Sequence, residues 1–520
     1  MEVSPRLLVG GAPMRQRCLR VKHILFSDLG CGEELNAQTR DEIFLMGVNY
    51  LKSGLSVCEM QDFSRLCEKK CFQLPEGCVL SVEDEATVLA RADAAMQDAL
   101  SVSEHQGEDS LSGTPNSFSM GPKRSRLEAV GMRELRAKMR MAEILADMHD
   151  YDAMNKTLRG LFLEVHSIQE MTINSQTVDS VLLELEIVRR SVELSLGAGA
   201  LEIVKTLVGN SMVSLIEHAS RCMLAAQGGG FSHVALQQHQ RSEETVREIE
   251  EHVLFFSIVR ALCMFEDCNF DGFARVFTAN GLRGAKWAPL SEELITKHGT
   301  AEVASSLGAR INTPGSLPAI RHLRDFVEEF ITSGVHLGVM VLFSAFAALP
   351  RMEAMELIIQ VDVRQLWEDV PEACTLVQVL EEARFAEALS LASKLASSFL
   401  KTDIFACKYG ELLLHQFQQA VVTEYVSSFT TIDVRKAALR LSIPEKDLQQ
   451  LLHLLILEGR LSAKMDLVAL VLTRKETCGD LVDVSCQCST LLECISQSDN
   501  CTSVVEQSLR VLSLHRNRTW

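Results

Sequence analysis

The feature of this sequence that most constrains its fold is a change of periodicity between residues 447 and 472. Apolar residues first recur at the spacing of one α-helix face, at Leu448, Leu451, Leu452 and Leu455. Gly459 follows at the position expected for a helix C-cap. Apolar Leu461, Ala463 and Met465 then alternate with polar Arg460, Ser462, Lys464 and Asp466, as in a half-buried strand. A second apolar run, Val468 to Leu472, lies at hairpin distance. This order of helix, strand, turn and strand predicts a winged helix.

The charge of the chain weighs against nucleic acid as its main partner. Over 520 residues, 51 lysines and arginines stand against 69 aspartates and glutamates, which gives a net charge of −18. An acidic surface repels phosphate, so we do not expect DNA or RNA to be the main partner. Few aromatic residues, with abundant leucine, alanine, glutamate and methionine, favour an all-α protein.

The cysteine content predicts a reducing compartment, and the length of the apolar runs predicts a protein without a membrane span. Sixteen cysteines in 520 residues fall far below the density of a disulfide scaffold, so we expect free thiols in a reducing compartment. Residues 337–349 form the longest apolar run, which is too short to cross a bilayer. Residues 1–17 lack the apolar core of a signal peptide. We expect a soluble, intracellular protein.

Breaks in composition divide the chain into five predicted regions. A stretch rich in serine, glycine and proline marks a flexible linker, and most of the remaining chain has helical periodicity. The regions are an N-terminal helical region (1–100), the linker (101–127), helical repeats (128–395), a winged-helix domain (396–475) and a C-terminal helical tail (476–520).

Three helical segments share a register typical of tetratricopeptide-like repeats. In each, an aromatic residue follows an acidic turn, at Tyr151, Phe270 and Phe385. An apolar residue follows three positions later, at Met154, Phe273 and Ala388. The pattern predicts helix–turn–helix units that stack into a solenoid, because one pair cannot bury its apolar face alone. An ordinary helical bundle stays open as the alternative.

One segment resembles the first half of a calcium-binding loop. Residues Asp267 to Gly272 place oxygen-bearing side chains at its first, third and fifth positions. The twelfth position, which needs a bidentate glutamate, is Thr278. We interpret this segment as the turn of a helix pair.

No motif predicts a catalytic, cofactor-binding or metal-binding residue. The pairs Cys67–Cys71 and Cys486–Cys488 have no further ligands at zinc-finger spacing. The glycines that begin at Gly197 follow a helical segment instead of a strand. The sequence contains no H-E-x-x-H, G-x-S-x-G or Walker motif. A site assembled from distant residues stays open.

The helix before the alternating strand has the wrong residues for reading DNA. We expect Ser442 to cap this helix, with Pro444 and Glu445 in its first turn. A helix that reads a groove presents Arg, Lys, Asn or Gln to base edges. Residues 444–457 contain one lysine against two acids, so we expect this helix to pack against the rest of its domain instead of reading DNA.

The order of these elements resembles the PCI domain, a module shared by the proteasome lid, the COP-nine signalosome and initiation factor three. The winged helix of this family is similar to "FTTIDVRKAALRLSIPEKDLQQLLHLLILEGRLSAKMD". The long helix that precedes it is similar to "FLKTDIFACKYGELLLHQFQQAVVTEYVSSF". The stretch that begins "RVKHILFSDLGCGEELNAQ" resembles the N-terminal region of a signalosome member of the family.

The resemblance implies a non-catalytic scaffold subunit of the signalosome. In that complex another subunit removes Nedd8 from cullins and so regulates cullin-RING ubiquitin ligases. The implied partners are other PCI-domain subunits, joined through wing edges and a bundle of C-terminal helices, with cullin-RING ligases reached through the complex. A proline at Ser462 or Lys464 is expected to harm this assembly more than folding. The expected interface residues are Arg460, Leu461, Ser462, Ala463, Lys464, Met465, Leu491, Ile495, Leu509 and Leu512.

Two alternatives remain at this point. A non-ATPase scaffold subunit of the proteasome lid has the same order of elements. A PCI protein of translation initiation or mRNA export needs a basic face on its winged helix. Residues 401–475 contain ten Lys or Arg and eight Asp or Glu, a net charge of only +2, which disfavours this second alternative.

Overall fold

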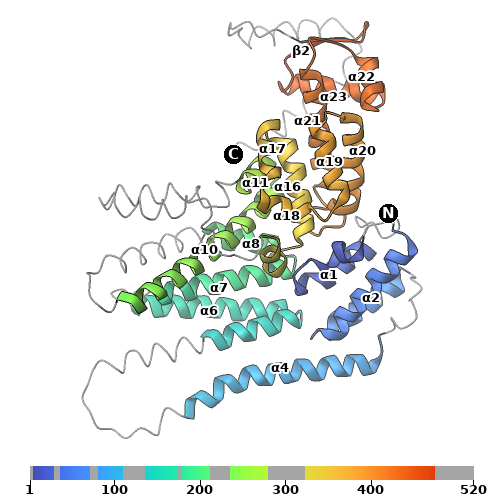
Figure 1. The fold of residues 1–520 in the computed structure, drawn as a ribbon. Coiled ribbons are helices and arrows are strands. Elements are labelled where there is room, and N and C mark those ends of the chain that lie inside the picture. Colours follow the sequence, from blue (N-terminus) through green and yellow to red (C-terminus); the bar gives the residue numbers. More distant parts are fainter. Residues whose placement is uncertain are drawn as a thin grey trace, which may run out of the picture. The chain divides into compact units, whose positions relative to one another are not determined.

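The computed structural model is mostly helical and contains one small antiparallel sheet (Figure 1). The chain forms two compact units, the first made of Met1–Val426 with Arg440–Ser442 and the second of Ser427–Leu439 with Ile443–Trp520. The prediction of a mostly helical protein is confirmed. The structure describes residues 4–27, 35–70, 80–108, 135–171, 178–210, 235–278 and 323–474.

Two of the N-terminal helices have a side chain that caps their first turn. Asn36 accepts a hydrogen bond from the backbone N–H of Thr39, and Ser56 accepts one from that of Glu59. The elements of this region are η1 (Arg6–Gly10), α1 (Met14–Phe26), α2 (Ala37–Ser53), α3 (Val57–Lys69) and α4 (Val82–Glu108).

Helix α4 corrects the predicted start of the linker at residue 101. The helix continues through Glu108, because polar residues such as Glu104 and Gln106 favour a helix and the next proline is Pro115. The remainder of the predicted linker, residues 109–127, lies outside the described residues.

Four helix pairs in the first unit share one type of turn. The pairs join residues 135–147 to α6 (Tyr151–Met171), α7 (Val178–Gly197) to α8 (Leu201–Asn210), α10 (Ala235–Glu266) to α11 (Phe270–Val276), and α19 (Pro371–Glu381) to α20 (Phe385–Leu395). One residue in each turn has a φ between 57° and 69°, namely His149, Gly199, Cys268 and Ala383. The next residue donates its N–H to the carbonyl five positions earlier, in each case at 2.9 Å. This bonding is that of a Schellman motif.

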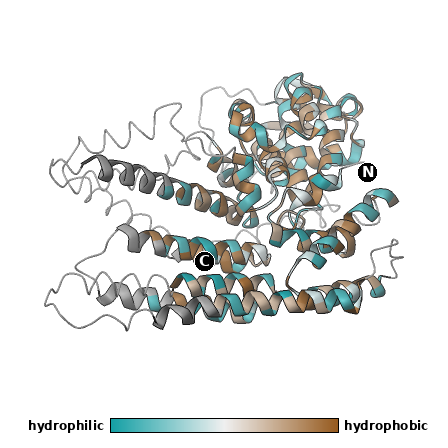
Figure 2. Ribbon diagram, turned by 60° about the horizontal axis from the view of Figure 1, so that its bottom comes forward, coloured by the Kyte–Doolittle hydropathy of each residue, from teal (hydrophilic) through white to brown (hydrophobic). Residues whose placement is uncertain are grey.

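The shared turn confirms the predicted helix–turn–helix segments. Each new helix begins two residues after the left-handed residue, so Tyr151, Phe270 and Phe385 are first helical residues, as is Leu201. The apolar residues three positions later are buried, at Met154, Phe273 and Ala388. Hydrophobic and hydrophilic residues alternate along most helices (Figure 2), which is the pattern of helices that bury one face.

Helix α16 (Gly334–Ala348) lies at the core of the remaining helices of the first unit. Every residue from Gly334 to Ala347 is buried. A Cβ at Gly338 would lie 2.8 Å from the backbone carbonyl carbon of Leu366, so glycine permits α18 to approach closely. The neighbouring elements are α15 (Leu323–Phe330), α17 (Arg351–Ile359), α18 (Val361–Trp367), η3 (Ala396–Leu400) and α21 (Gly410–Ser427).

No described helix is by itself long and apolar enough to cross a bilayer. The bent pair α15 and α16 reaches the necessary length and composition only when its two helices are taken together.

The second unit contains the sheet. It comprises β1 (Thr431–Asp433), α22 (Val434–Leu441), α23 (Glu445–Leu457), β2 (Ala463–Asp466) and β3 (Val471–Arg474), although the end of α22 is grouped with the first unit. The strand order is β1-β3-β2, and both neighbouring pairs are antiparallel. Buried leucines of α23 and of the sheet form its core, at Leu448, Leu452, Leu455 and Leu472.

Two local predictions in the second unit are wrong. Ser442 does not cap α23, because it has a φ of 55° in the turn and Pro444 occupies the N-cap position without a side-chain hydrogen bond. The second strand begins at Val471 instead of Val468, because Asp466 Oδ1 accepts hydrogen bonds from the N–H groups of Val468 and Ala469. This Asx turn places Val468 in the hairpin loop.

Candidate functional site

The predicted interface strand lies at one edge of the sheet. The strand itself, β2, contains only Ala463 to Asp466, and Arg460 to Ser462 precede it. The predicted alternation is present, since Leu461 and Ala463 are 5% exposed and Met465 is partly buried. The polar residues of this stretch are exposed, at Arg460, Ser462, Lys464 and Asp466.

Hydrogen bonds of β3 fix which backbone groups of β2 face outward. Arg474 donates its N–H to the carbonyl of Thr430, on the β1 side of β3. The in-plane direction of the N–H and C=O groups alternates along an antiparallel strand, so Thr473 faces β2. Lys464 is the register partner of Thr473, and its N–H and C=O therefore face β3.

The N–H and C=O groups of Ala463 and Met465 consequently face the open edge. Ala463 donates its N–H to the carbonyl of Leu461. Within the described chain, the Met465 N–H and the carbonyls of Ala463 and Met465 remain for a strand from outside. The N–H of Lys464 belongs to the internal ladder, so a proline there is now expected to damage the hairpin as well as the assembly.

The hairpin tip beside this edge is apolar. Leu467 is 65% exposed and Val468 is 91% exposed. The Asx turn that presents them depends on the carboxylate of Asp466, and hydrogen bonds from the backbone of Ala469 and Val468 lower the pKa of that carboxyl. The edge thus combines unpaired backbone groups with exposed apolar side chains, as a docking strand requires.

The other predicted interface residues belong to the C-terminal tail. Leu491, Ile495, Leu509 and Leu512 lie outside the described residues. The same is true of Cys71 and of the pair Cys486–Cys488.

The segment that resembles a calcium loop is a turn, as predicted. Asn269 caps α11 by accepting a hydrogen bond from the N–H of Gly272 at 2.9 Å. Asp267 Oδ1 lies 2.8 Å from Lys205 Nζ, and Asp271 is paired with Arg275. The side-chain oxygens of the segment are therefore engaged in capping and ion pairs.

A buried ion pair that the sequence reasoning missed connects α1 to a distant loop. Arg20 Nη2 lies 2.7 Å from Asp403 Oδ2, and both side chains are at most 1% exposed. Arg20 also donates to Thr332 Oγ1, and Asp403 Oδ1 accepts from the N–H groups of Phe405 and Ala406. Burial alone would raise the pKa of Asp403, but Arg20 and these N–H groups lower it.

A buried histidine beside this pair is neutral. His336 Nδ1 lies 2.9 Å from Ser333 Oγ, and Nε2 lies 3.2 Å from Thr402 Oγ1. Burial lowers the pKa of His336 to about 3. The one sequence signal for the whole cluster is Arg20, a charged residue on the same helix stripe as Ile24.

A second polar cluster centres on Glu59 of α3. Its carboxylate pairs with Lys22 Nζ and lies 3.2 Å from His149 Nδ1, which is 2.9 Å from the hydroxyl of Tyr151. Burial would raise the pKa of Glu59, but His149 and Lys22 lower it to about 2. Burial raises the pKa of the adjacent Cys18 to about 12, so this thiol is not a nucleophile.

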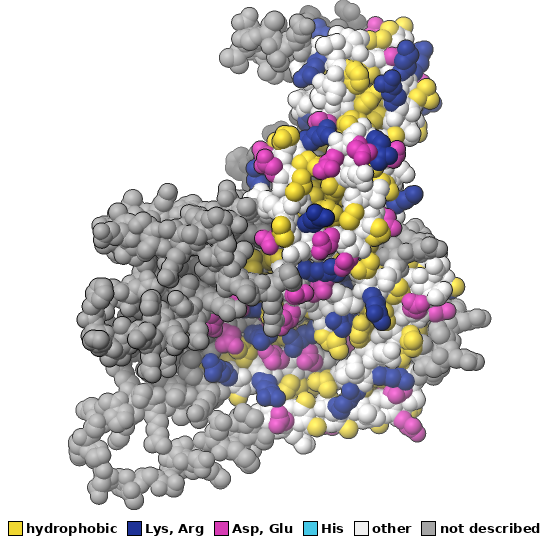
Figure 3. Space-filling model, viewed as in Figure 1, with side chains coloured by type: hydrophobic (Ala, Val, Ile, Leu, Met, Phe, Trp, Pro, Cys, Tyr) yellow, Lys and Arg dark blue, Asp and Glu magenta, His cyan; other side chains and the backbone are white. Residues whose placement is uncertain are grey.

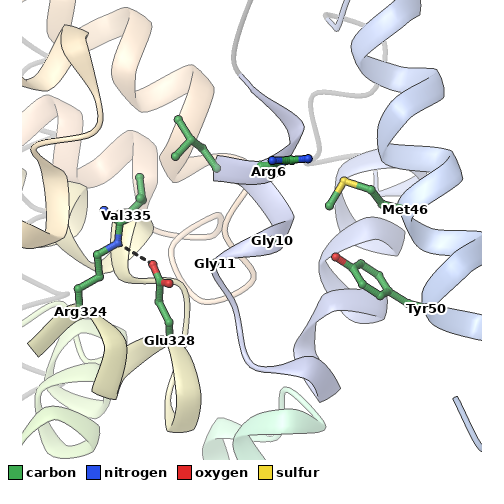
Figure 4. Close-up of a pocket in the computed structure, with 9 residues that line it drawn as sticks. Arg6, Gly10, Gly11, Met46, Tyr50, Arg324, Glu328 and Val335 are labelled. Atoms are coloured by element: carbon green, nitrogen blue, oxygen red, sulfur yellow. Dashed lines mark hydrogen bonds and ion pairs between the residues drawn. The ribbon is translucent and has the colours of Figure 1, made fainter. Parts of the chain in front are cut away.

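A surface cleft of about 420 Å³ adjoins the N-terminal segment (Figure 4). Met46 and Tyr50 lie on one side of the backbone at Gly11, and Arg324 and Glu328 lie on the other. A Cβ at Gly11 would lie 2.9 Å from the Glu328 carboxylate, which Arg324 Nε binds at 2.9 Å. The charges on the α15 side therefore pair with each other, and the cleft is a seam where the N-terminal segment packs.

In the described part of the chain, no group of three or more His, Cys, Asp or Glu side chains is placed so that it could hold a metal ion.

Comparison with known proteins identifies no family. No protein-family model matches the chain, and no curated protein matches it. The β2 edge remains the site with the clearest geometry.

Proposed function

We propose that this chain is a non-catalytic scaffold subunit that binds a neighbouring subunit through the open edge of β2. The complex that the resemblance favours is the COP-nine signalosome, with this chain in the position of subunit one. In this proposal another subunit removes Nedd8 from cullins, and the chain contributes to the framework that places it on cullin-RING ubiquitin ligases. The complex acts in the cytoplasm and the nucleus.

The observation that supports this proposal most directly is the hydrogen-bonding direction of β2. An edge strand with unpaired groups is a template for another strand unless it is covered. Strand addition uses main-chain hydrogen bonds for affinity, and the Met465 N–H and the carbonyls of Ala463 and Met465 face the side where such a strand would lie. The exposed Leu467 and Val468 add apolar area at the same hairpin.

The order of elements in the second unit agrees with a winged helix. One strand, two helices and a hairpin follow the long helix α21, and β3 is the central strand. The helix pairs with a common turn agree with degenerate tetratricopeptide-like repeats. We propose both assignments, since a helical repeat array that leads into a winged helix is the pattern of the PCI family.

Charge favours protein over DNA as the partner of this unit. The first turn of α23 exposes Glu445 and Asp447 beside Lys446. Gln449 has a side chain of the kind that contacts bases, but its Nε2 donates a hydrogen bond to the Glu445 carboxylate at 3.1 Å. Carboxylates at the start of a recognition helix would repel phosphate.

Affinity purification of the tagged full-length chain from its own cells, followed by mass spectrometry, tests the proposal. We expect signalosome subunits in stoichiometric amounts. Recovery of proteasome-lid subunits instead would favour the alternative assignment, and recovery of neither set would overturn the scaffold assignment. The purified chain alone should leave a Nedd8–cullin conjugate intact, whereas metal-dependent cleavage by it would contradict the non-catalytic role.

A further inference from the structure

Helix α22 exposes a face that combines two cations with a leucine. Arg435, Lys436 and Leu439 are exposed, and Leu439 is 81% exposed. Their spacing of three and four residues places them on one side of the helix. The opposite side is buried at Val434, Ala437, Ala438 and Leu441. Figure 3 shows basic side chains gathered over α22, at the upper right of the view.

The two cations have no ion-pair partner among the described residues. Asp433, the nearest acid in sequence, caps the helix instead, and its Oδ1 accepts hydrogen bonds from the N–H groups of Arg435 and Lys436. Several arginines of the first unit are paired, as Arg351 is with Glu424 and Arg384 is with Glu387. On α22, two adjacent cations instead stand beside an exposed leucine, in a chain whose net charge is −18.

We propose that the α22 face, made of Arg435, Lys436 and Leu439, binds an acidic amphipathic segment of a partner protein. Glutamates or aspartates of that segment pair with Arg435 and Lys436, and an apolar side chain between them covers Leu439. This surface is distinct from the β2 edge, so the inference does not depend on the proposed function.

The central leucine favours a protein segment over nucleic acid. Cations that bind phosphate work with polar or aromatic neighbours that bond or stack, whereas an exposed aliphatic side chain offers nothing to a phosphate backbone. A protein segment satisfies both features at once, because carboxylates pair with the cations while an apolar residue removes Leu439 from water.

The test uses fluorescence anisotropy with the full-length chain. The probe is a synthetic acidic helix with glutamates around a central leucine, and a labelled DNA duplex serves as a second probe. The variants are Arg435→Glu with Lys436→Glu, Leu439→Ser, and the charge-matched control Lys446→Glu with Lys394→Glu, which changes exposed lysines outside this face and outside β2. Circular dichroism verifies that each variant is folded.

We expect saturable binding of the acidic helix, weakened roughly tenfold by reversal of Arg435 and Lys436 and by a similar factor in Leu439→Ser. The charge-matched control should change affinity by less than about threefold. Equal losses in the two charge-reversal variants, no binding by the folded chain, or tighter binding of DNA that depends on Arg435 and Lys436 would each overturn the proposal. Retained binding in Met465→Pro would show that this site and the β2 edge are independent.

Discussion

Prolines at two neighbouring positions of β2 should have opposite consequences. Proline has no N–H, so its effect depends on where the replaced N–H points. The N–H of Lys464 faces β3, opposite Thr473, and the N–H of Met465 faces the open edge. We therefore expect Lys464→Pro to damage the hairpin and Met465→Pro to leave it intact while blocking strand addition.

The contacts of each residue determine how much each proline should lower the free energy of unfolding. Lys464→Pro removes one ladder hydrogen bond, worth about 1 kcal/mol, and leaves the Thr473 carbonyl without a partner at a further cost of about 1–3 kcal/mol. Met465→Pro removes no ladder bond but loses part of a half-buried side chain, which costs about 1 kcal/mol. Met465→Ala has the same side-chain loss and keeps the N–H, so it is the matched control.

Two measurements on the full-length chain separate folding from assembly. Hydrogen exchange of the backbone amides of residues 463–474 measures whether the hairpin is folded. Co-purification with co-expressed signalosome PCI subunits measures whether the open edge of β2 still binds a neighbour. Lys464→Pro should lose protection in β2 and β3. Met465→Pro should keep protection and lose its partner, while Met465→Ala keeps both.

Loss of hairpin protection in Met465→Pro to the extent seen in Lys464→Pro would refute the assigned direction of the β2 hydrogen bonds. A protected Met465→Pro variant that still binds its neighbours would instead show that β2 is not the contact.

Four further changes test the packing of the first unit. Arg20→Met should lower the free energy of unfolding by about 3–5 kcal/mol in chemical denaturation, because Asp403 stays buried without its cation. The pKa of Glu59 is about 2 in the folded chain, against an ordinary value of 4.5. The ionised carboxylate therefore stabilises the fold fully above pH 4.5, and this stabilisation is lost as the pH falls toward 2. The difference in unfolding free energy between the native chain and Glu59→Gln should shrink over that interval. Gly338→Ala should lower stability by about 1–3 kcal/mol through overpacking against α18. Gly160→Ala, where an added Cβ would meet no atom beyond its own helix backbone within 4 Å, should instead raise stability by about 0.5–1 kcal/mol; chemical denaturation measures both glycine variants.

The turns between helix pairs could be predicted because their causes are local. An acidic or polar residue, an aromatic residue and an apolar residue three positions later sufficed to place the starts of α6, α11 and α20. The Schellman bonds and the caps at Asp150 and Asn269 join residues at most five positions apart. Leu201 was missed because it lacks the aromatic ring, although its turn is the same.

The buried ion pair could not be predicted because its partners are far apart in sequence. Arg20 and Asp403 are separated by 383 positions, and neither residue has a neighbour that indicates the other. Only the packing of α1 against the α15–α16 turn and the loop after η3 brings the two charges together, and burial then makes the pairing obligatory.

In β2, the direction of the side chains follows from the local sequence, whereas the direction of the backbone N–H and C=O groups depends on the neighbouring strands. Alternation from Leu461 to Asp466 determined which side chains face the core, since that direction has a period of two along any strand. The N–H and C=O groups alternate in the plane of the sheet, and their direction depends on which strand lies on each side. This direction is fixed by the pairing of β3 with β1 on one side and with β2 on the other. As a result, the N–H of Lys464 faces β3 and the N–H of Met465 faces the open edge.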